Sequence, residues 1–352
     1  MSSATSSVRL TELAHGGGCG CKLAPSVLQE ILKGSPQMGL VADLLVGTET
    51  SDDAAVYRIN ADQAIVATTD FFMPIVDDGY DFGRIAATNA LSDIYAMGAR
   101  PIFALAIVGM PIAKIGADTI RAILAGGNAV CADAGIPIAG GHSIDSVEPI
   151  YGLVAIGIAD PNHILRNCTV RKGDVLILTK PLGVGIFSAA LKKGVLGQGE
   201  YAQMVSSTTQ LNAVGTELAS VPGVHAMTDV TGFGLLGHAL EMCRGSSVSL
   251  HLDMHAVPAF PAAVALAQRG IVTGASKRNW DSYGSSAVLP EAFAEWRRDL
   301  LCDPQTSGGL LIACERTAAA AVLDLLEKEK FPHARVIGEF GDEPARIMIS
   351  DG

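Results

Sequence analysis

The chain has 352 residues, more than a single hydrophobic core usually organises, so two domains are expected. Apolar residues make up 49% of the sequence and charged residues 17%, a composition that is typical of a folded globular protein and excludes an intrinsically disordered one. The formal net charge of −11 argues against broad binding of nucleic acid or anionic membranes, although it allows a phosphate ligand that is held through metal ions.

No targeting or membrane-spanning segment is expected. The first ten residues are rich in Ser and Thr and have no apolar core, unlike a signal peptide. The most apolar run, residues 101–113, is too short to span a bilayer. The seven cysteines are sparse and odd in number, so no disulfide framework follows from them, and we expect a protein of the reducing cytoplasm.

A glycine-rich stretch stands near the start of the chain, before any regular apolar pattern. Residues 15–22 read His-Gly-Gly-Gly-Cys-Gly-Cys-Lys, and we name them the Gly-rich loop. Glycine loses much backbone entropy on ordering, so we expect a mobile loop that closes over a ligand and a thiol that Lys22 biases towards the reactive thiolate. Two other interpretations stay open at this point: a metal site formed by His15, Cys19 and Cys21, and a disordered N-terminal linker.

Helices and strands alternate along the first half of the chain. The expected helices cover residues 25–33, 82–97 and 115–134, and the expected strands cover residues 54–57, 63–69, 101–108, 136–139 and 151–158. Asp70 follows the second strand, a position from which a carboxylate lines a crevice. Asn89 and Asp93 lie four residues apart on an otherwise apolar helix, so they share one face, which we expect to border a cavity. A Gly-Gly turn at 140–141 is expected to present backbone N–H groups to an oxyanion.

The second half begins after a boundary that is expected at residues 159–162. Its expected strands cover residues 173–179, 224–228, 247–252, 310–313, 335–340 and 346–350; its expected helices are one ending at 191 and those over 201–220, 235–242, 258–268 and 318–330; residues 280–287 are expected to form a surface loop. The strand that runs into Asp229 is followed by glycines and then a helix. That order is typical of a phosphate or metal site, because a helix N-terminus favours anions and the carboxylate can hold a cation beside them.

Five carboxylates are candidates for one site, since each stands at a strand end, in a turn or on the polar face of a helix. They are Asp52, Asp53, Asp70, Asp93 and Asp229. If several converge, their repulsion raises their pKa values and costs stability unless cations fill the site. Oxygen ligands without histidine at ligand spacing suit Mg²⁺. Because neither a Walker A motif nor a dinucleotide fingerprint opening a helix is present, the sequence indicates a magnesium–nucleotide enzyme of another kind.

Seven motifs stand out along the chain. They cover residues 15–22, 52–57, 68–72, 82–90, 140–145, 227–234 and 301–309. Their residues and their order resemble the selenophosphate synthetase (selenide, water dikinase) family over nearly the whole length. The resemblance implies a two-domain α/β (α+β) fold of the aminoimidazole ribonucleotide synthetase type with a mobile Gly-rich N-terminal segment, a homodimer, and a reaction in which ATP, selenide and water give selenophosphate, AMP and phosphate.

The resemblance also implies a division of the chain. Residues 1–47 would form an N-terminal segment with the catalytic loop, residues 48–160 an ATP- and Mg-binding domain that dimerises, and residues 161–352 a C-terminal α/β domain. Mg²⁺ is the implied cofactor, and a monovalent cation such as K⁺ is a further candidate. A selenium-delivery protein is a candidate partner.

Single residues receive roles from the same resemblance. Cys19 matches the family's catalytic cysteine or selenocysteine, and Lys22 its essential lysine. The positions that match magnesium ligands are Asp53, Asp93 and Asp229. The positions that match nucleotide-binding segments are Lys22, Thr50, Ser51, Asp52, Asp70, Asn89, Asp93, Gly141, His142 and Ser143, and the last three are expected to reach across the dimer.

These roles agree with the chemistry. Lys22 would neutralise charge on the transferring γ-phosphoryl group, and Cys19 would capture or deliver selenium rather than carry a phosphoryl group. Cys21 is expected to be a bystander. Other enzymes of the same fold, such as aminoimidazole ribonucleotide synthetase, thiamine-monophosphate kinase and the hydrogenase-maturation dehydratase, do not explain the sequence Cys-Gly-Cys-Lys at 19–22. An alternative of another class is a thiol or metal sensor that binds nucleotide without turnover.

Overall fold

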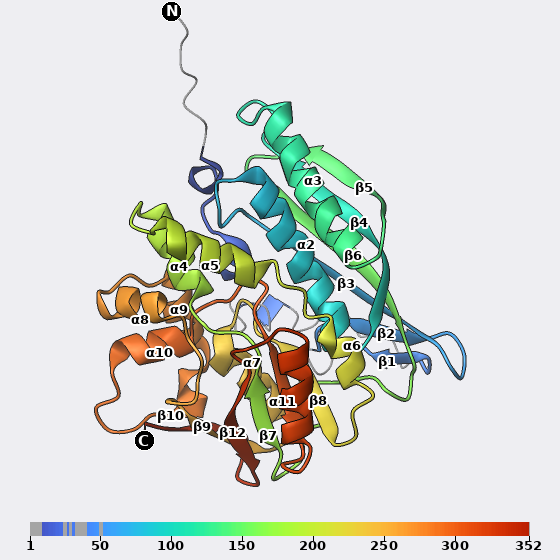
Figure 1. The fold of residues 1–352 in the computed structure, drawn as a ribbon, viewed down its shortest axis with the longest axis vertical. Coiled ribbons are helices and arrows are strands. Elements are labelled where there is room, and N and C mark those ends of the chain that lie inside the picture. The colour runs from blue at the N-terminus through green and yellow to red at the C-terminus, as the bar shows by residue number, and fades with distance from the viewer. Residues whose placement is uncertain (1–8, 24–26, 28–29, 32–40, 49–51, 352) are drawn as a thin grey trace, which may run out of the picture.

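The computed structural model describes residues 9–23, 27, 30–31, 41–48 and 52–351, and these form two β-sheets flanked by helices (Figure 1). The strands are β1 (Leu44–Val46), β2 (Ala55–Arg58), β3 (Ala64–Phe72), β4 (Arg100–Met110), β5 (Ile138–Asp145), β6 (Ile150–Ala159), β7 (Val175–Leu178), β8 (Val224–Asp229), β9 (Ser249–Asp253), β10 (Ala287–Val288), β11 (Leu310–Cys314), β12 (Arg335–Gly341) and β13 (Ile347–Ser350). The helices are α2 (Gly79–Ala96), α3 (Ala117–Asp133), α4 (Val184–Lys192), α5 (Gln198–Thr208), α6 (Val214–Leu218), α7 (Gly234–Ser246), α8 (Pro261–Gln268), α9 (Gly274–Tyr283), α10 (Glu295–Leu301) and α11 (Ala319–Lys328), and short 3-10 turns are η1 (Leu10–Glu12), η2 (Gly18–Cys21) and η3 (Gly284–Ser286). The expected α/β class is confirmed.

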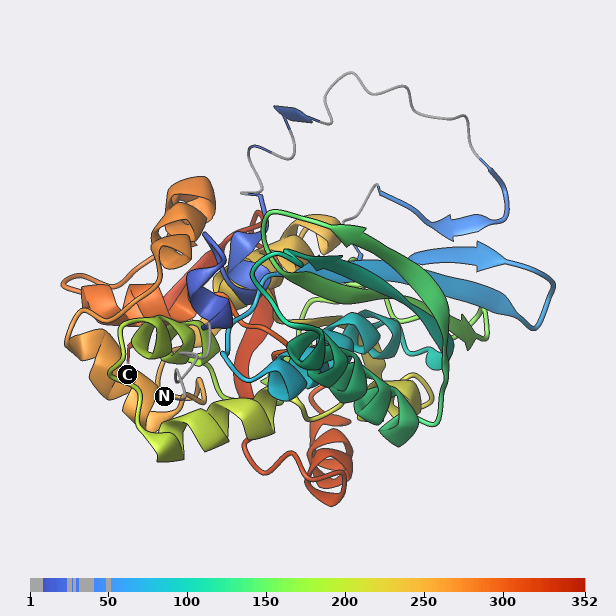
Figure 2. The same cartoon turned by 90° about the horizontal axis from the view of Figure 1, so that it is seen from above.

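The first sheet has the strand order β1-β2-β3-β6-β4-β5 and carries α2 and α3 on one face (Figure 2). The two helices touch through glycine: a β-carbon on Gly83 would lie 1.9 Å from the carbonyl oxygen of Ile123, and one on Gly126 would lie 2.0 Å from that of Tyr80. The polar residues Asn89 and Asp93 of α2 are buried on a face that contacts β3, since Asn89 binds Asp70 and Asp93 accepts from Thr68.

The opposite face of this sheet has no described helix against it in Figures 1 and 2. Its edge strand β5 is exposed along almost all of its length. Large apolar side chains of this part of the chain also remain exposed, among them Phe71 at 48% and Ile144 at 57%. An open apolar face of this kind is typical of a protein–protein contact.

The second sheet has the strand order β10-β13-β9-β12-β7-β11-β8. Every residue of β7 and β11 is buried, as expected for strands that are covered on both faces. Alternate side chains point to two different cores: Ile177 packs in the cluster that includes Leu326 of α11, whereas Leu178 packs in the cluster that includes Leu236 of α7.

The N-terminal segment lies at the junction of the two sheets (Figure 2). Asp77, in the connection from β3 to α2, accepts hydrogen bonds from Arg9 Nε at 2.9 Å and from the Thr11 backbone N–H at 2.9 Å. On the other side, Lys192 Nζ of α4 donates to the Ala14 carbonyl at 3.1 Å. The segment is thus bound by both halves of the molecule just before the Gly-rich loop begins.

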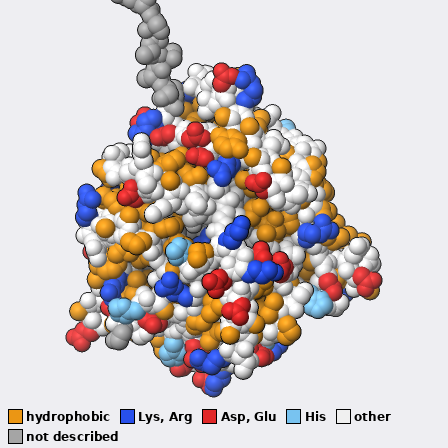
Figure 3. All heavy atoms as spheres, in the orientation of Figure 1, with side chains coloured by type: hydrophobic (Ala, Val, Ile, Leu, Met, Phe, Trp, Pro, Cys, Tyr) orange, Lys and Arg blue, Asp and Glu red, His pale blue; other side chains and the backbone are white. Residues whose placement is uncertain are grey.

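The surface offers no broad field of one charge on the face drawn in Figure 3, where acidic, basic and apolar side chains are interspersed. Of the helices in the described part of the chain, none is both long and apolar enough to cross a membrane.

Three expectations about local structure are wrong. Residues 140–141 do not form a turn: they lie inside β5, where a β-carbon on Gly141 would meet the Ala106 carbonyl oxygen of β4 at 2.1 Å, so glycine permits the strands to approach. The helix expected over 201–220 is two helices, α5 and α6, because Asn212 turns inward between them to bind Ser92 and the Gly308 carbonyl. The loop expected at 280–287 begins inside α9, whose buried face is made of small and polar residues and so shows no apolar period.

Two further expectations differ from the structure or lie partly outside it. The strand expected over residues 63–69 does not end before Asp70: β3 continues through Phe72, so Asp70 lies inside the strand. Most of the helix expected over residues 25–33 lies outside the described residues, although 27, 30 and 31 are helical.

Candidate active site

Three carboxylates converge between the two sheets. Asp53 precedes β2, Asp93 lies on α2, and Asp229 is the last residue of β8. One oxygen from each lies within 4.8 Å of the others, and this is the one group of metal-ligand side chains found among the described residues. The sequence pattern predicted a shared site, and the structure brings these three members of the carboxylate set together.

Each of these carboxylates is held by a hydroxyl group. Thr68 Oγ1 donates to Asp93 at 2.5 Å, Thr228 Oγ1 donates to Asp53 Oδ1 at 2.9 Å, and Ser92 donates to Asp229. Asp53 Oδ2 is buried and has no hydrogen-bond partner among the described residues. Burial raises the pKa values of all three side chains, and repulsion from Asp229 raises those of Asp53 and Asp93 further. An oxygen-only cluster with an unsatisfied buried oxygen suits a hard divalent cation.

The Gly-rich loop is docked over this cluster. Its centre forms η2, which starts at Gly18 with φ of +52°. A β-carbon on Gly18 would lie 2.2 Å from Thr306 Oγ1 and 2.5 Å from Ile75, so only glycine fits. The Gly18 N–H donates to the Met73 carbonyl at 2.8 Å, and the Cys19 N–H donates to Thr306 Oγ1 at 3.2 Å. The loop therefore rests on both halves of the chain.

Docking buries Cys19 completely. Its Sγ lies 3.2 Å from Asn89 Oδ1, to which the thiol donates. Burial, aided by the nearby Asp70 charge, raises the pKa of Cys19 well above its usual range, and the opposing effect of Lys22 is smaller. The expected bias towards thiolate is thus wrong for the docked loop, because loss of water disfavours the sulfur anion more than one lysine favours it.

Lys22 faces the carboxylates. Its Nζ is 3.3 Å from Asp70 Oδ2, and its side chain is 37% exposed. Burial lowers its pKa, but Asp70, Cys19 and the acidic cluster outweigh that effect and raise it well above the ordinary value. Lys22 is therefore a fixed positive charge at the exposed edge of an otherwise acidic site.

Asn89 organises the contacts between loop and cluster. Its Nδ2 donates to Asp70 at 2.7 Å, while its Oδ1 accepts from the Ser307 N–H at 2.7 Å and from Cys19. Ser307 is in turn held by the buried Lys180, whose Nζ donates to the Ser307 carbonyl at 3.1 Å. Burial lowers the pKa of Lys180 to about 7.

Other predicted residues lie apart from this centre. Asp52 accepts from the Asn167 N–H at 2.8 Å and lies 3.5 Å from Arg166, so it joins the first half of the chain to the start of the second. Gly141, His142 and Ser143 lie on the exposed edge strand β5 and not at the acidic cluster. Thr50 and Ser51 lie outside the described residues.

The metal site considered for the Gly-rich loop does not form in this structure. The His15 ring pairs with Glu148 at 2.8 Å, Cys19 binds Asn89, and Cys21 Sγ donates to the Gly18 carbonyl at 2.8 Å. Since these three side chains go in different directions, they do not share an ion.

Sequence reasoning missed the hydroxyl, amide and lysine side chains that hold the site. They are Thr68, Ser92, Lys180, Asn212, Thr228 and Thr306. A usable signal existed for two of them, because Ser92 and Thr228 stand directly before Asp93 and Asp229. Thr228 and Asp229 are neighbours on a strand, so their side chains point to opposite faces. The hydrogen bond from Thr228 to a different aspartate, Asp53, was therefore hard to predict.

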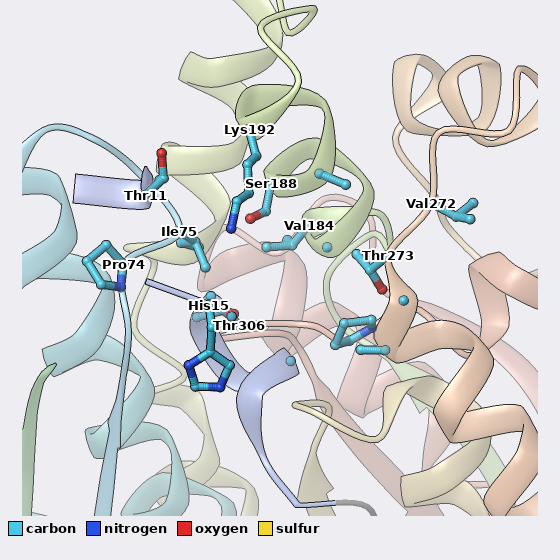
Figure 4. A pocket seen from close by; sticks show the side chains of 18 of the residues that line it. Thr11, His15, Pro74, Ile75, Val184, Ser188, Lys192, Val272, Thr273 and Thr306 are labelled. Atoms are coloured by element: carbon cyan, nitrogen blue, oxygen red, sulfur yellow. The ribbon is translucent and has the colours of Figure 1, made fainter. Parts of the chain in front are cut away.

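A cavity of about 280 Å³ lies behind the docked loop, and none of the site's carboxylates is among the residues that line it (Figure 4). The loop glycines, the connection after β3, helix α4 and the start of α9 form its walls. Figure 4 shows Lys192 and Ser188 directed into it from α4, with His15 and Thr306 across from them.

Two family models match the chain. The model described as AIR synthase related protein, N-terminal domain, matches residues 51–159, and the model of the C-terminal domain matches residues 171–350. Among curated proteins, selenide, water dikinase of Pseudomonas straminea is 61% identical over 342 residues, which are 97% of this chain and 96% of that protein. The selenide, water dikinase of Burkholderia cenocepacia is 60% identical with 97% of each chain covered.

Solved structures with less sequence identity share the fold. A thiamine-monophosphate kinase from Stenotrophomonas maltophilia is 21% identical with a TM-score of 0.64, covering 94% of this chain and 96% of that one. A chain of a HypE–HypF complex is 17% identical with a TM-score of 0.71, covering 93% of this chain and 96% of that one. At these identities the likeness establishes architecture alone.

Proposed function

The chain belongs to the selenide, water dikinase family, and we propose that the docked loop and the acidic cluster synthesise selenophosphate from ATP, selenide and water. The observation that carries this proposal is the placement of Cys19 and Lys22 against Asp70 and the three convergent carboxylates. In this reaction a bond forms between selenium and the γ-phosphorus of ATP while the bond from that phosphorus to the bridging oxygen breaks. Water then cleaves the resulting ADP to AMP and phosphate.

Lys22 supplies the positive charge that phosphoryl transfer needs. Its ammonium stands at the edge of the site, 3.3 Å from Asp70, and its raised pKa keeps it protonated at neutral pH. A fixed cation stabilises the negative charge on the oxygens of a transferring phosphoryl group. The docked loop also keeps water from the reacting phosphorus.

The acidic cluster fits magnesium. Asp53, Asp93 and Asp229 would hold the ion, since all three offer oxygen, one of those oxygens is buried without a partner, and their crowding raises their pKa values. Bound there, Mg²⁺ would neutralise and orient phosphate oxygens. K⁺ is a second cation for the assay below. We also retain Asp70 and Asn89 as residues beside the nucleotide.

Cys19 is proposed to handle selenium rather than phosphate. Inside the docked loop it is a buried, protonated thiol, so it cannot attack until the loop moves or a base takes its proton. A loop that opens to collect selenium and closes to deliver it accounts for both the glycines and the burial. The supplier of selenium is either free selenide, which the assay below uses, or a selenium-delivery protein.

We further propose that two chains form a homodimer through the open face of the first sheet. The exposed apolar residues there, together with the exposed strand β5, support this proposal, as does the place of Gly141, His142 and Ser143 on that strand if they reach a partner's nucleotide. Light scattering should give twice the chain mass, and a monomer would contradict the proposal. The divisions 1–47, 48–160 and 161–352 remain our proposed domains. The seven free cysteines support a reducing, cytoplasmic setting.

The reaction is tested by incubating the protein without oxygen with ATP, Mg²⁺ and selenide, with and without K⁺, and following phosphorus by ³¹P NMR. We expect a new selenium-dependent signal with AMP and phosphate in equal amounts, and none of it from Cys19→Ser or Lys22→Ala. ATP converted only to ADP, or AMP formed equally well without selenide, would refute the proposal. Nucleotide binding without any AMP would point instead to a sensor.

A further inference from the structure

The cavity behind the Gly-rich loop has a positively charged rim. Lys192 and Lys193 line it from the end of α4, and Arg278 lines it from α9. Within the described part of the chain none of these three forms a salt bridge, although the charge of Lys192 acts on the nearby Glu148, whose carboxylate pairs with His15 at 2.8 Å. In a protein with a net charge of −11, three cations against one carboxylate around one cavity form a local site for an anion.

Two of these cations also bind the backbone in and next to the loop. Lys192 Nζ donates to the Ala14 carbonyl, directly before the loop, at 3.1 Å, and Arg278 donates to the Gly20 carbonyl within it at 3.0 Å. Both acceptors are neutral, so these contacts do not cancel the positive charge. Ser188 and Thr273, which carry hydroxyl groups, are also lining residues.

Only a thin wall separates the cavity from Cys19. Thr306 lines the cavity, and its Oγ1 also accepts the Cys19 N–H at 3.2 Å. Gly18 lies against Thr306, since a β-carbon on it would come within 2.2 Å of Thr306 Oγ1. A small movement of the loop at this glycine would join the cavity to the thiol.

The acidic site and the cavity differ in charge. Asp53, Asp70, Asp93 and Asp229, where a metal and the nucleotide would bind, are all absent from the lining of the cationic cavity. Hydrogen selenide is an anion at neutral pH, so the acidic site repels it. A nucleophile must also reach the γ-phosphorus on the side opposite the leaving group.

We propose that this cavity is the vestibule through which the selenium donor, as a small chalcogenide anion, is attracted and passed to Cys19. The inference rests on the proposed function, since it names the route by which that reaction receives its second substrate. The cavity is far larger than one selenium atom, so it concentrates the anion through charge and does not clamp it.

A matched pair at Ser188 tests the charge alone. Ser188 lines the cavity but takes no part in the described hydrogen bonds that hold the loop. Ser188→Asp and Ser188→Asn have nearly the same size and differ in charge. We expect Ser188→Asp to raise the KM for selenide on the order of tenfold and Ser188→Asn by less than about twofold, with the KM for ATP unchanged in both. Added salt should shrink the difference.

A second pair serves if the Ser188 variants fold poorly. Arg278→Gln removes a rim charge, whereas Lys277→Gln removes a charge of the same helix that pairs with Asp281 at 3.1 Å outside the cavity. Only the first should raise the KM for selenide. Equal selenide KM values within either pair would overturn the inference. The inference would also be overturned if the variants changed only the inhibition by orthophosphate and not the KM for selenide. That result would indicate that the cavity binds the phosphate product. If the wild-type protein makes no selenophosphate, the proposed function itself fails. That outcome is distinct from a failure of the vestibule, which would leave selenophosphate synthesis intact and only make the selenide KM values of the paired variants equal.

Discussion

Gly18 shows how one residue can decide whether the active site closes. Its φ of +52° is costly for any residue with a side chain, and the space for a β-carbon is occupied by Thr306 and Ile75. Gly20, two positions later, has more room: its nearest neighbour would be Pro304 Cγ at 3.3 Å. The loop therefore needs glycine for different reasons at different positions.

We predict that Gly18→Ala lowers kcat at least tenfold, because the left-handed conformation alone costs about 1–2 kcal/mol and each 1.4 kcal/mol is a factor of ten. The melting temperature should change by less than about 3 °C, since Cys19 is the only side chain of residues 15–22 among the fully buried members of the main core. Gly20→Ala is the control and should retain activity within about threefold. Equal losses in steady-state rate for the two variants would contradict this account of the loop.

At the scale of elements, the motif at 301–309 fixes the start of α4. Asp303 Oδ2 accepts the N–H groups of Gly185 at 3.0 Å and Ile186 at 3.3 Å, and Gln305 Oε1 accepts that of Val184 at 3.2 Å. These bonds satisfy the free N–H groups of the first helical turn. Because α4 carries Lys192 at its other end, the same motif also positions the contact that holds the Gly-rich loop.

Burial raises the pKa of Asp303 to about 8. A carboxyl group whose pKa is higher in the folded than in the unfolded state binds more protons when folded, so its stabilising effect is complete below about pH 4 and is lost as the pH rises towards 8. Relative to Asp303→Asn, the wild-type protein should lose free energy of unfolding across this window, by at most about 1.4 kcal/mol per pH unit. Urea unfolding at pH 5, 6.5 and 8 measures this; parallel curves for the two proteins would contradict it.

At the scale of the whole molecule, the acidic cluster joins parts that are remote in sequence. Asp53 and Asp93 come from the first half and Asp229 from the second, so their repulsion opposes the association of the two sheets. A divalent cation would convert this repulsion into a cross-link. Stability and catalysis then compete at the same three side chains.

We predict that Asp93→Asn melts at a higher temperature than wild type, by a few degrees, when magnesium is absent, because it removes a repelling charge. The variant should also lose the rise in melting temperature that saturating Mg²⁺ and ATP give the wild type. That rise reflects a stabilisation free energy of about 2.7 kcal/mol at a ligand concentration one hundred times Kd. Asp118→Asn removes the same charge from an exposed position on α3 and should change neither quantity. An unchanged ligand response in Asp93→Asn, measured by calorimetry, would contradict the metal assignment.

Much of the fold and part of the site could be predicted from the sequence. Most strands from β2 to β13, apart from β10 and the greater part of β5, and helices such as α2 and α3 follow apolar periodicity, which depends on neighbours in the chain. The acidic residues at strand ends and the polar pair Asn89 and Asp93 on an apolar helix were visible for the same reason, and the structure brings Asp53, Asp93 and Asp229 of that set together.

The sequence by itself determined which residues are available: the loop glycines, the thiol, the lysine and the carboxylates. Only the tertiary structure decided what they become. Whether Cys19 is a thiol or a thiolate depends on burial by distant residues, the strand conformation at Gly141 depends on β4, and the break before α6 depends on Asn212 turning towards α2. Desolvation, backbone approach and long-range hydrogen bonds arise from contacts across hundreds of positions, and no local pattern encodes them.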